Sequence, residues 1–230
     1  KTFDQIAEAY FMLIKNLVQR ATTSYHIDKI VFIAGNDFFN TDNIHNATAS
    51  HMNVQEINET WYNSYTKGFD LLVKVIDMLI NFVPNVHIVS LPGNHGKSKE
   101  FYLVHALSMF FRSIDGISFD IGAEPRKLIS YGETSIMYHH GNCKLETLPT
   151  IMAQEFREVW GATKYKRIHT GDKHHFMEKE INGVIIKQFP SLSQTDTWHN
   201  ENNYILNQRK ALVLVHNYTE GLVATFEKGI

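Results

Sequence analysis

Cysteine is nearly absent from this sequence of 230 residues. Cys143 is the single cysteine, so no internal disulfide can form, and this usage fits a reducing compartment. An excess of charge is also missing, because 22 Lys and Arg residues face 24 Asp and Glu residues for a net charge of −2. No global basic field therefore indicates nucleic-acid binding, although a local patch is not excluded. We expect a cytoplasmic protein.

Long uninterrupted apolar runs are missing as well. The longest apolar helical pattern, at residues 71–83, contains Lys74 and Asp77 and is too short to span a bilayer. No signal peptide is visible, and we expect no membrane partner. What the chain does contain is apolar material for a substantial core, because hydrophobic residues make up 43% and charged residues only 20%.

The first half of the chain alternates between helical and strand patterns. Apolar residues at helical spacing predict helices over residues 2–21, 55–82 and 99–112, with Ser98 capping the last. Nearly continuous apolar runs at 27–34 and 86–91 are typical of buried parallel strands.

The second half of the chain is rich in strand patterns. The predicted strands cover residues 117–121, 127–131, 134–139, 166–170, 176–181, 183–189, 210–215 and 221–227, and one helix is predicted at 148–159. Asn182-Gly183 between two strand patterns indicates a hairpin. Because no repeat or linker is visible, we predict a single α/β domain over residues 1–230, with a two-sheet β-sandwich flanked by helices.

Three short polar clusters each follow an apolar strand pattern. They are Gly93-Asn94-His95, His140-Gly141 and the segment 171–175, Gly-Asp-Lys-His-His. Side chains at the carboxyl ends of strands in an open α/β sheet converge on one crevice. A mixture of oxygen and imidazole ligands suits a catalytic divalent metal better than a structural zinc. The clusters therefore predict a metal site.

The polar residues in the first half have more than one interpretation. Asn94 supplies a neutral oxygen ligand, and the neighbouring His95 can donate a proton. Asn36 and Asp37 follow the first strand, where Gly35 lets the backbone turn sharply. They either point into the crevice or are simply turn formers.

The histidines of the second half are not equivalent. Strand alternation places His139 and His140 on opposite faces, so at most one is a ligand, and we favour His140 beside Gly141. Asp172 and His174 lie two residues apart, which in an extended segment puts both on one side for a single site. The alternative is a polar turn. A polar loop at 190–199 is either the wall of a substrate cleft or an ordinary surface loop.

Taken in order, these clusters resemble the calcineurin-like metallophosphoesterases. That family carries Asp-x-His, then Gly-Asp, Gly-Asn-His, a His at a strand end, and Gly-His-x-His, and the last four are recognisable over residues 27–199. Residues 33–40, the long helix after them and the later Gly-Asn-His look most like the DNA repair exonuclease branch, including its phage-type members. That branch runs Gly-Asp-Leu-Phe-His at the second motif. Aligning residues 37–40 on its Asp-Leu-Phe-His leaves Asn36 as one inserted residue.

The resemblance implies a metallophosphoesterase fold and a site for two divalent metal ions. Manganese is favoured, with iron, zinc or magnesium as alternatives. By position in the motifs, Asp37 would bridge both ions and His95 would donate a proton to the leaving oxygen. Asn94, His140 and Asp172 would complete the second metal, and His174 would belong to the first.

Two departures from the family pattern stand out. No upstream Asp-x-His precedes the first helix; on the family pattern it would lie before Lys1, so the resemblance predicts that this chain lacks its N-terminal strand and is inactive or weak as given. Asp172 stands where the family has His, which keeps an oxygen ligand and favours manganese or magnesium.

The function expected from this resemblance is that of a metal-dependent phosphoesterase. The expected chemistry is phosphodiesterase or nuclease action on a nucleic acid or nucleotide, by attack of a metal-bound hydroxide. Two alternatives stay open: a catalytically degenerate scaffold that binds a protein partner, and a small-molecule phosphatase. Dimerisation is common among the nucleases that the chain resembles, so a homodimer is also expected.

Overall fold

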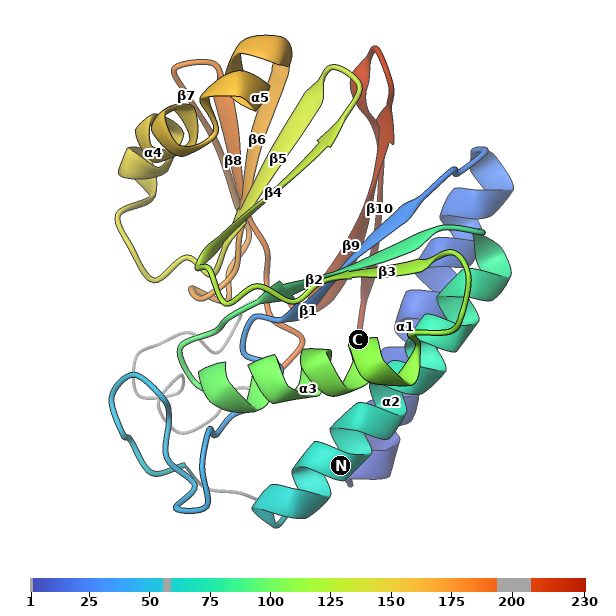
Figure 1. The fold of residues 1–230 in the computed structure, drawn as a ribbon, viewed down its shortest axis with the longest axis vertical. Coiled ribbons are helices and arrows are strands. Elements are labelled where there is room, and N and C mark those ends of the chain that lie inside the picture. Colours follow the sequence, from blue (N-terminus) through green and yellow to red (C-terminus); the bar gives the residue numbers. More distant parts are fainter. Residues whose placement is uncertain (1, 56–58, 194–207) are drawn as a thin grey trace. The chain divides into compact units, whose positions relative to one another are not determined.

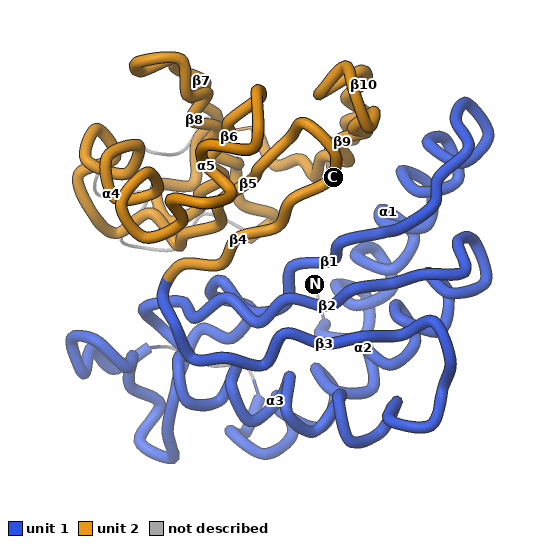
Figure 2. Tube along the Cα trace, turned by 45° about the horizontal axis from the view of Figure 1, so that its top comes forward, with its two compact units in different colours: residues 1–125 blue, residues 126–230 orange. Residues whose placement is uncertain are grey.

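The computed structural model describes residues 2–55, 59–193 and 208–230. These residues form two compact units, unit 1 at residues 1–125 and unit 2 at residues 126–230, coloured separately in Figure 2. The expectation of a single domain stays a prediction.

Unit 1 contains a parallel sheet and three helices (Figure 1). The sheet has the order β1-β2-β3, and both pairs are parallel. Helix α1 packs against α2, and α3 packs against β1 and β2. In chain order the elements are α1 (Phe3–Ser24), β1 (Ile30–Gly35), α2 (Trp61–Phe82), β2 (Val86–Leu91), α3 (Lys97–Phe110) and β3 (Ile117–Asp120).

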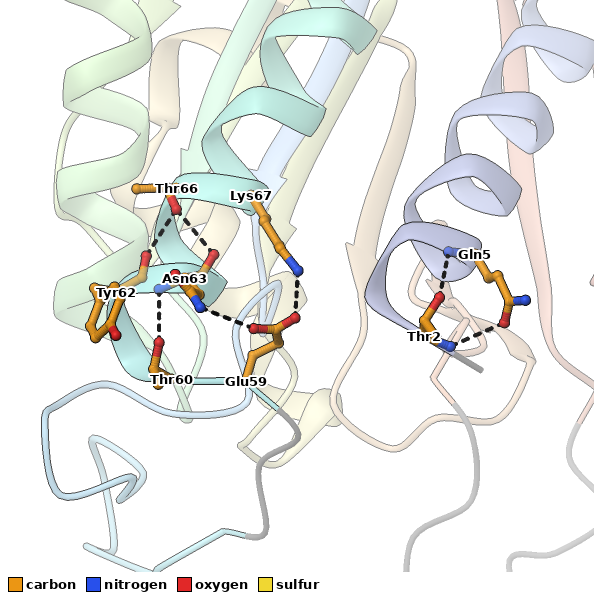
Figure 3. Close-up of polar contacts among 8 residues, drawn as sticks. All are labelled: Thr2, Gln5, Glu59, Thr60, Tyr62, Asn63, Thr66 and Lys67. Atoms are coloured by element: carbon orange, nitrogen blue, oxygen red, sulfur yellow. Dashed lines mark hydrogen bonds and ion pairs between the residues drawn. The ribbon is translucent and has the colours of Figure 1, made fainter.

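Side chains of unit 1 define where its first two helices begin (Figure 3). Thr2 and Gln5 form a capping box at α1, each side chain bonding to the other's backbone N–H. Thr60 caps α2 by accepting from the Asn63 N–H at 3.3 Å. Helix α2 therefore begins at Trp61, six residues after the predicted start.

The cap of α3 differs from the prediction. Ser98 is not the cap, because the helix begins at Lys97 with Gly96 as its N-cap residue. The Asp42 carboxylate, from the loop after β1, accepts from the Ser98 N–H at 2.6 Å and from the Lys99 N–H at 3.0 Å. A carboxylate here satisfies orphan donors at the positive end of the helix dipole. The helix is therefore capped by a residue distant in sequence.

Unit 2 is built on a mixed sheet of order β4-β5-β6-β8-β7. Strands β5, β6 and β8 are parallel, and β4 and β7 are antiparallel edges. Strands β9 and β10 pair with each other. The elements are β4 (Arg126–Tyr131), β5 (Thr134–His139), η1 (Leu145–Thr147), α4 (Leu148–Glu155), α5 (Arg157–Ala162), β6 (Tyr165–Thr170), β7 (Met177–Ile181), β8 (Val184–Gln188), β9 (Lys210–Asn217) and β10 (Gly221–Gly229).

Most elements of unit 2 follow the predicted patterns. The hairpin at Asn182-Gly183 is confirmed, with both residues at positive φ of 50° and 79° as a type I′ turn requires. The single helix predicted at 148–159 is instead two helices, because Phe156 leaves the helical region at φ −118°, ψ 46°. One face of the sheet packs a core cluster of Met137, Leu148, Met152, Ile168, Val184 and Ile186.

Parallel and mixed sheets with flanking helices confirm the predicted α/β class. Among the described residues, no helix is both long enough and apolar enough to cross a membrane.

Candidate functional site

The loops that follow β1 and β2 meet at one edge of the unit 1 sheet. The two strands end at the paired residues Gly35 and Leu91, and the Asn36 N–H donates to the Leu91 carbonyl at 2.7 Å. Beyond them, Asp37 Oδ1 accepts from the backbone N–H of His95 at 2.8 Å. Asp37 and the Gly-Asn-His loop are therefore in direct contact.

Gly93 is required by this close approach. A Cβ on Gly93 would lie 2.0 Å from Asp37 Oδ1 and 2.4 Å from the Asp37 nitrogen, so only glycine fits. Asn36 and Asp37 themselves adopt left-handed backbone conformations, with φ of 58° and 65°. Such conformations cost about 1–2 kcal/mol for each residue with a Cβ, and the surrounding contacts have to offset that cost.

The ring of His95 is oriented by Asn40. His95 Nδ1 lies 3.1 Å from the Asn40 side-chain oxygen and 3.3 Å from its carbonyl oxygen. Because both neighbours are acceptors, we assign the ring proton to Nδ1, which leaves Nε2 as the basic nitrogen of the neutral ring. The ring is half-buried. This arrangement suits proton transfer at Nε2.

Asn94 lies in the same loop, which a neighbouring segment holds in place. The Asn94 carbonyl accepts from the Ser50 N–H at 3.1 Å, and the His95 carbonyl accepts from the Ala49 N–H at 2.8 Å. Residues 93–95 are thus supported on one side by Asp37 and on another by the segment around Ala49.

Glu100 belongs to this cluster, although the sequence patterns did not indicate it. Its carboxylate is 1% exposed and accepts from the N–H groups of Gly93 at 3.0 Å and Phe39 at 3.3 Å. Burial and the charge of Asp37 raise the pKa of Glu100 to about 7, although the backbone hydrogen bonds oppose this rise. Glu100 therefore ties the Asp37 loop to the Gly93 loop.

A second polar cluster lies at the ends of β5 and β6 in unit 2. His140 Nε2 is 3.3 Å from Asp172 Oδ1, and both side chains are largely buried. The Gly171 N–H donates to the His140 carbonyl at 2.7 Å. Gly141, at φ 117°, allows this approach, because a Cβ there would meet the Gly171 oxygen at 3.1 Å.

Asp172 is held in its ionised form. Burial by itself would raise the pKa of Asp172, but hydrogen bonds and charges from His140 and Lys173 outweigh it and lower the pKa to about 2. Lys173 Nζ lies 3.0 Å from Asp172 Oδ2. At neutral pH Asp172 is therefore an ionised carboxylate, and it faces the imidazole Nε2 of His140.

The backbone of this segment differs from the sequence-based assumption. Residues 171–175 are not extended: Asp172 and His174 have φ of 58° and 57°, and the Lys173 N–H donates to the Gly171 carbonyl at 2.7 Å. The argument that alternation puts Asp172 and His174 on one side was therefore wrong, because alternation applies only to extended chain. His174 is half-buried in the same turn.

His139 is less suited to metal binding than its neighbour. His139 Nδ1 accepts from the Gly141 N–H at 3.0 Å, so that lone pair is already used. Burial, with the Arg126 charge, lowers the pKa of His139. These contacts support the choice of His140.

The second cluster offers two donor atoms of the kinds that divalent metals bind. Two donor atoms bound to one ion at about 2.1 Å, and about 100° apart, lie about 3.2 Å from each other. The 3.3 Å separation of His140 Nε2 from Asp172 Oδ1 fits this value. Asp37 and Asn94 belong to unit 1. Within the residues that the structure describes, no three His, Cys, Asp or Glu side chains form one metal-binding group.

The polar loop predicted at 190–199 lies mostly outside the described residues. Its beginning is ordered by a hydrogen bond of 2.7 Å between the hydroxyl groups of Ser191 and Ser193.

Comparison with known proteins identifies neighbours only among solved structures. No family model matches the chain, and neither does any curated protein. The structure of Vps29 from Entamoeba histolytica in complex with Zn²⁺ is 13% identical and covers 86% of this chain and 98% of its own, with a TM-score of 0.39. A predicted phosphoesterase from Streptococcus pneumoniae is 11% identical, with coverages of 87% and 97% and a TM-score of 0.35.

A third neighbour is an archaeal phosphodiesterase. It is 11% identical, with coverages of 87% and 99% and a TM-score of 0.38. These TM-scores lie below 0.5, so the neighbours carry no argument about the activity of this chain. A DNA repair exonuclease is not among these three neighbours, and that branch stays a prediction.

Proposed function

We propose that this chain is a metal-dependent phosphoesterase that hydrolyses phosphodiester bonds in a nucleic acid or nucleotide. The proposed ligands are Asp37, Asn94, His140, Asp172 and His174, for two divalent ions, with Mn²⁺ favoured. When bound, such ions neutralise the phosphate and lower the pKa of a coordinated water.

The pairing of His140 with Asp172 carries this proposal. A carboxylate is rarely buried in a protein interior without a compensating partner, because an unpaired buried charge is strongly destabilising. Here hydrogen bonds and charges of His140 and Lys173 lower the pKa of Asp172 to about 2, and Asp172 Oδ1 lies 3.3 Å from His140 Nε2. The two atoms thus offer one oxygen and one nitrogen donor at the separation that adjacent ligands of one ion adopt.

The proposed role of His95 follows from its orientation. Asn40 accepts from Nδ1–H in both protonation states of the ring, so the ring keeps its position while Nε2 gains or loses a proton. In the proposed reaction, protonated His95 gives the Nε2 proton to the leaving oxygen. Asp37 supports this arrangement by accepting from the His95 backbone N–H.

A scaffold without catalysis is the second candidate, and one observation favours it. Lys173 Nζ lies 3.0 Å from Asp172 Oδ2, so the lysine cation already neutralises part of the charge of the carboxylate that the metal would need. The side chain of Lys173 is exposed, however, and a surface lysine moves at little energetic cost. We therefore rank the enzyme first.

Metal content is the experiment that tests the proposal. After loading with Mn²⁺ and removal of free metal, elemental analysis should find about one ion or more per wild-type chain, and little in Asp172→Ala or Asp37→Ala. Asp77→Ala, at an exposed position in α2, is the matched control and should retain the metal.

Two activity assays then separate the remaining alternatives. Hydrolysis of bis(p-nitrophenyl) phosphate in preference to p-nitrophenyl phosphate supports a phosphodiesterase, and the reverse preference supports a small-molecule phosphatase. Metal retained in both Asp37→Ala and Asp172→Ala would show that the ligands are misassigned. Metal binding with no turnover on either substrate would favour the scaffold.

A further inference from the structure

A pocket in unit 1 lies beside the loop that carries Asn94 and His95. Its volume is about 250 Å³, and it is formed by the end of β2, the first turns of α3 and the loop after β3. Ser90 and Pro92 line it at the end of β2, and Ala123 lines it from the loop after β3. Because Pro92 is three residues before His95, the Cα atoms of these two residues lie at most about 11 Å apart. A molecule in this pocket can therefore also reach the loop of the proposed proton donor.

Helix α3 contributes two aromatic side chains to the pocket. Phe101 and Tyr102 both line it, and Tyr102 is 61% exposed. The Phe101 ring is held between neighbours: its centroid lies 5.9 Å from that of Tyr102, edge to face, and 6.2 Å from that of His105, stacked. The Tyr102 ring thus has a fixed aromatic neighbour while much of its surface stays accessible. An accessible aromatic ring beside a pocket is a platform on which a planar base can stack.

A buried hydroxyl group also lines the pocket. Ser90 is 4% exposed, and its hydroxyl forms no hydrogen bond within the described part of the chain. Buried polar groups in folded proteins nearly always have a hydrogen-bond partner. The Ser90 hydroxyl can both donate and accept, so it has a hydrogen bond to offer to the polar edge of a base in the pocket.

Lys97 is the charged side chain among the described residues that line the pocket. It is exposed and forms no ion pair with the described residues. The backbone at the start of α3 is not available to an anion, because the Asp42 carboxylate already accepts from the N–H groups of Ser98 and Lys99. A phosphate group in the pocket would therefore be bound by the Lys97 ammonium. The lining residues include no Asp, Glu, His or Cys, so this set does not suit a metal ion.

We propose that this pocket binds the base of a nucleotide substrate, with the base against Tyr102 and an adjoining phosphate at Lys97. The proposal rests on the proposed function, because it assigns a substrate subsite to the same reaction. Aromatic rings, a hydroxyl and one cation match a molecule that combines a planar ring, polar ring edges and a phosphate. The volume of about 250 Å³ is below the range of about 300–1,000 Å³ for drug-sized ligands, so the pocket holds one base and not a whole dinucleotide.

Isothermal titration of the full chain with dAMP tests this pocket. EDTA is present, so binding at the pocket is measured apart from the proposed metal site. We expect one dAMP per chain, bound more tightly than either deoxyadenosine or inorganic phosphate, because only dAMP carries both the ring and the phosphate. A short single-stranded oligo(dA) is titrated in parallel: tighter binding of the oligonucleotide identifies a nucleic acid as the source of the base, and tighter binding of dAMP identifies a free nucleotide.

Matched variants locate the bound nucleotide. Tyr102→Ala should weaken dAMP binding about tenfold, because it removes the ring on which the base stacks. Lys97→Met should weaken dAMP binding about threefold and leave deoxyadenosine binding unchanged, because only dAMP carries the phosphate. Tyr62→Ala and Lys74→Met, at exposed positions of α2, are the controls and should bind as the wild type does. All four side chains are exposed, so we expect each variant to fold and to keep the wild-type Tm.

Four results would overturn the proposal. They are absence of dAMP binding to the wild type, wild-type affinity in Tyr102→Ala, an equal loss of affinity in Tyr62→Ala, and equal losses for dAMP and deoxyadenosine in Lys97→Met. Failure of the proposed function gives a different result. If dAMP binds at Tyr102 but the chain takes up no Mn²⁺, the enzyme is refuted and the nucleotide pocket stands. If Mn²⁺ binding and turnover are found without dAMP binding, the pocket alone is refuted.

Discussion

His95 and Asn40 form the smallest functional arrangement in unit 1. The sequence suggested His95 as a proton donor, and its neighbour Asn40 was of interest only as part of a motif. The 3.1 Å contact between His95 Nδ1 and the Asn40 side-chain oxygen adds a physical reason, since it leaves Nε2 as the basic nitrogen of the neutral ring. A donor of this kind can be tested apart from metal binding.

His95→Ala should lower turnover by about 10²–10⁴-fold and leave the metal content unchanged, because His95 is proposed as a proton donor and not as a ligand. Turnover of bis(p-nitrophenyl) phosphate and elemental analysis on the same sample measure the two effects. Asn40→Ala should shift the pH profile of turnover, and it should lower turnover less than His95→Ala does. Loss of the metal in His95→Ala would refute the donor assignment.

Glu100 is a second single residue with a structural effect, because its carboxylate joins two loops. Glu100→Gln keeps the shape of the side chain but presents an N–H₂ group to one of two N–H donors, so one buried hydrogen bond is lost. We expect the free energy of unfolding to fall by about 1–3 kcal/mol. Mn²⁺ affinity should fall as well, because the loops that carry Asp37 and Asn94 lose a bond through Phe39 and Gly93 that joins them.

Urea unfolding and Mn²⁺ titration measure these two consequences. Glu8→Gln, at an exposed position of α1, is the control and should change neither. Unchanged stability and metal affinity in Glu100→Gln would show that the loops hold their geometry without this carboxylate.

At the scale of elements, helix α2 shows how a terminus is set by a single hydroxyl. The hydroxyl groups of two threonines, Thr60 just before the helix and Thr66 within it, form hydrogen bonds to the backbone with different consequences (Figure 3). Thr60 accepts from the Asn63 N–H, which has no partner within the helix. Thr66 donates to the carbonyls of Tyr62 and Asn63, and the first of these already accepts within the helix.

Thr60→Ala should therefore lower the free energy of unfolding by about 1 kcal/mol. Thr66→Ala should be neutral or slightly stabilising, because alanine has the higher helix propensity and a back-bonded hydroxyl adds little. Thermal or urea unfolding of the two variants side by side makes this comparison. Equal losses in both would contradict the capping argument.

At the scale of the whole molecule, the buried histidines of unit 2 predict how stability depends on pH. Burial first, and then the charges of Arg167 and Lys187, lower the pKa of His216 from its ordinary 6.5 to about 4. His169 is shifted in the same direction. Between these pKa values the unfolded chain binds a proton that the folded chain does not, so stability is lost as the pH falls from about 6.5 to about 4.

For His216 alone this loss should be about 2 kcal/mol between pH 7 and pH 5. His216→Phe should remove the contribution of His216 to this loss. The difference in unfolding free energy between the two pH values should therefore be smaller in the variant. Urea unfolding of both proteins at pH 7 and at pH 5 measures it. A pH dependence identical in both proteins would show that His216 takes up its proton as readily when folded.

Local sequence patterns alone were enough to predict most helices and strands and the order of the polar clusters along the chain. Strand β2 lies at the predicted residues 86–91, and the Asn182-Gly183 turn joins β7 to β8 as predicted. Such features depend on neighbours within a few residues, namely alternation, helical spacing and turn chemistry. The same reasoning indicated Asn94 and His95, because polar side chains that end parallel strands gather at one edge, whereas Asp37 was assigned from the family resemblance.

Only the tertiary structure decided which distant residues complete those features. Asp42 caps α3 across 56 residues, Asn40 orients His95 across 55, and Glu100 reaches the Phe39 N–H across 61. No local period encodes a partner at such separations. No local period encodes the left-handed backbone of Asp172 and His174 either. The sequence by itself determined which residues are proposed to carry the chemistry, whereas the packing of loops determined how each is held.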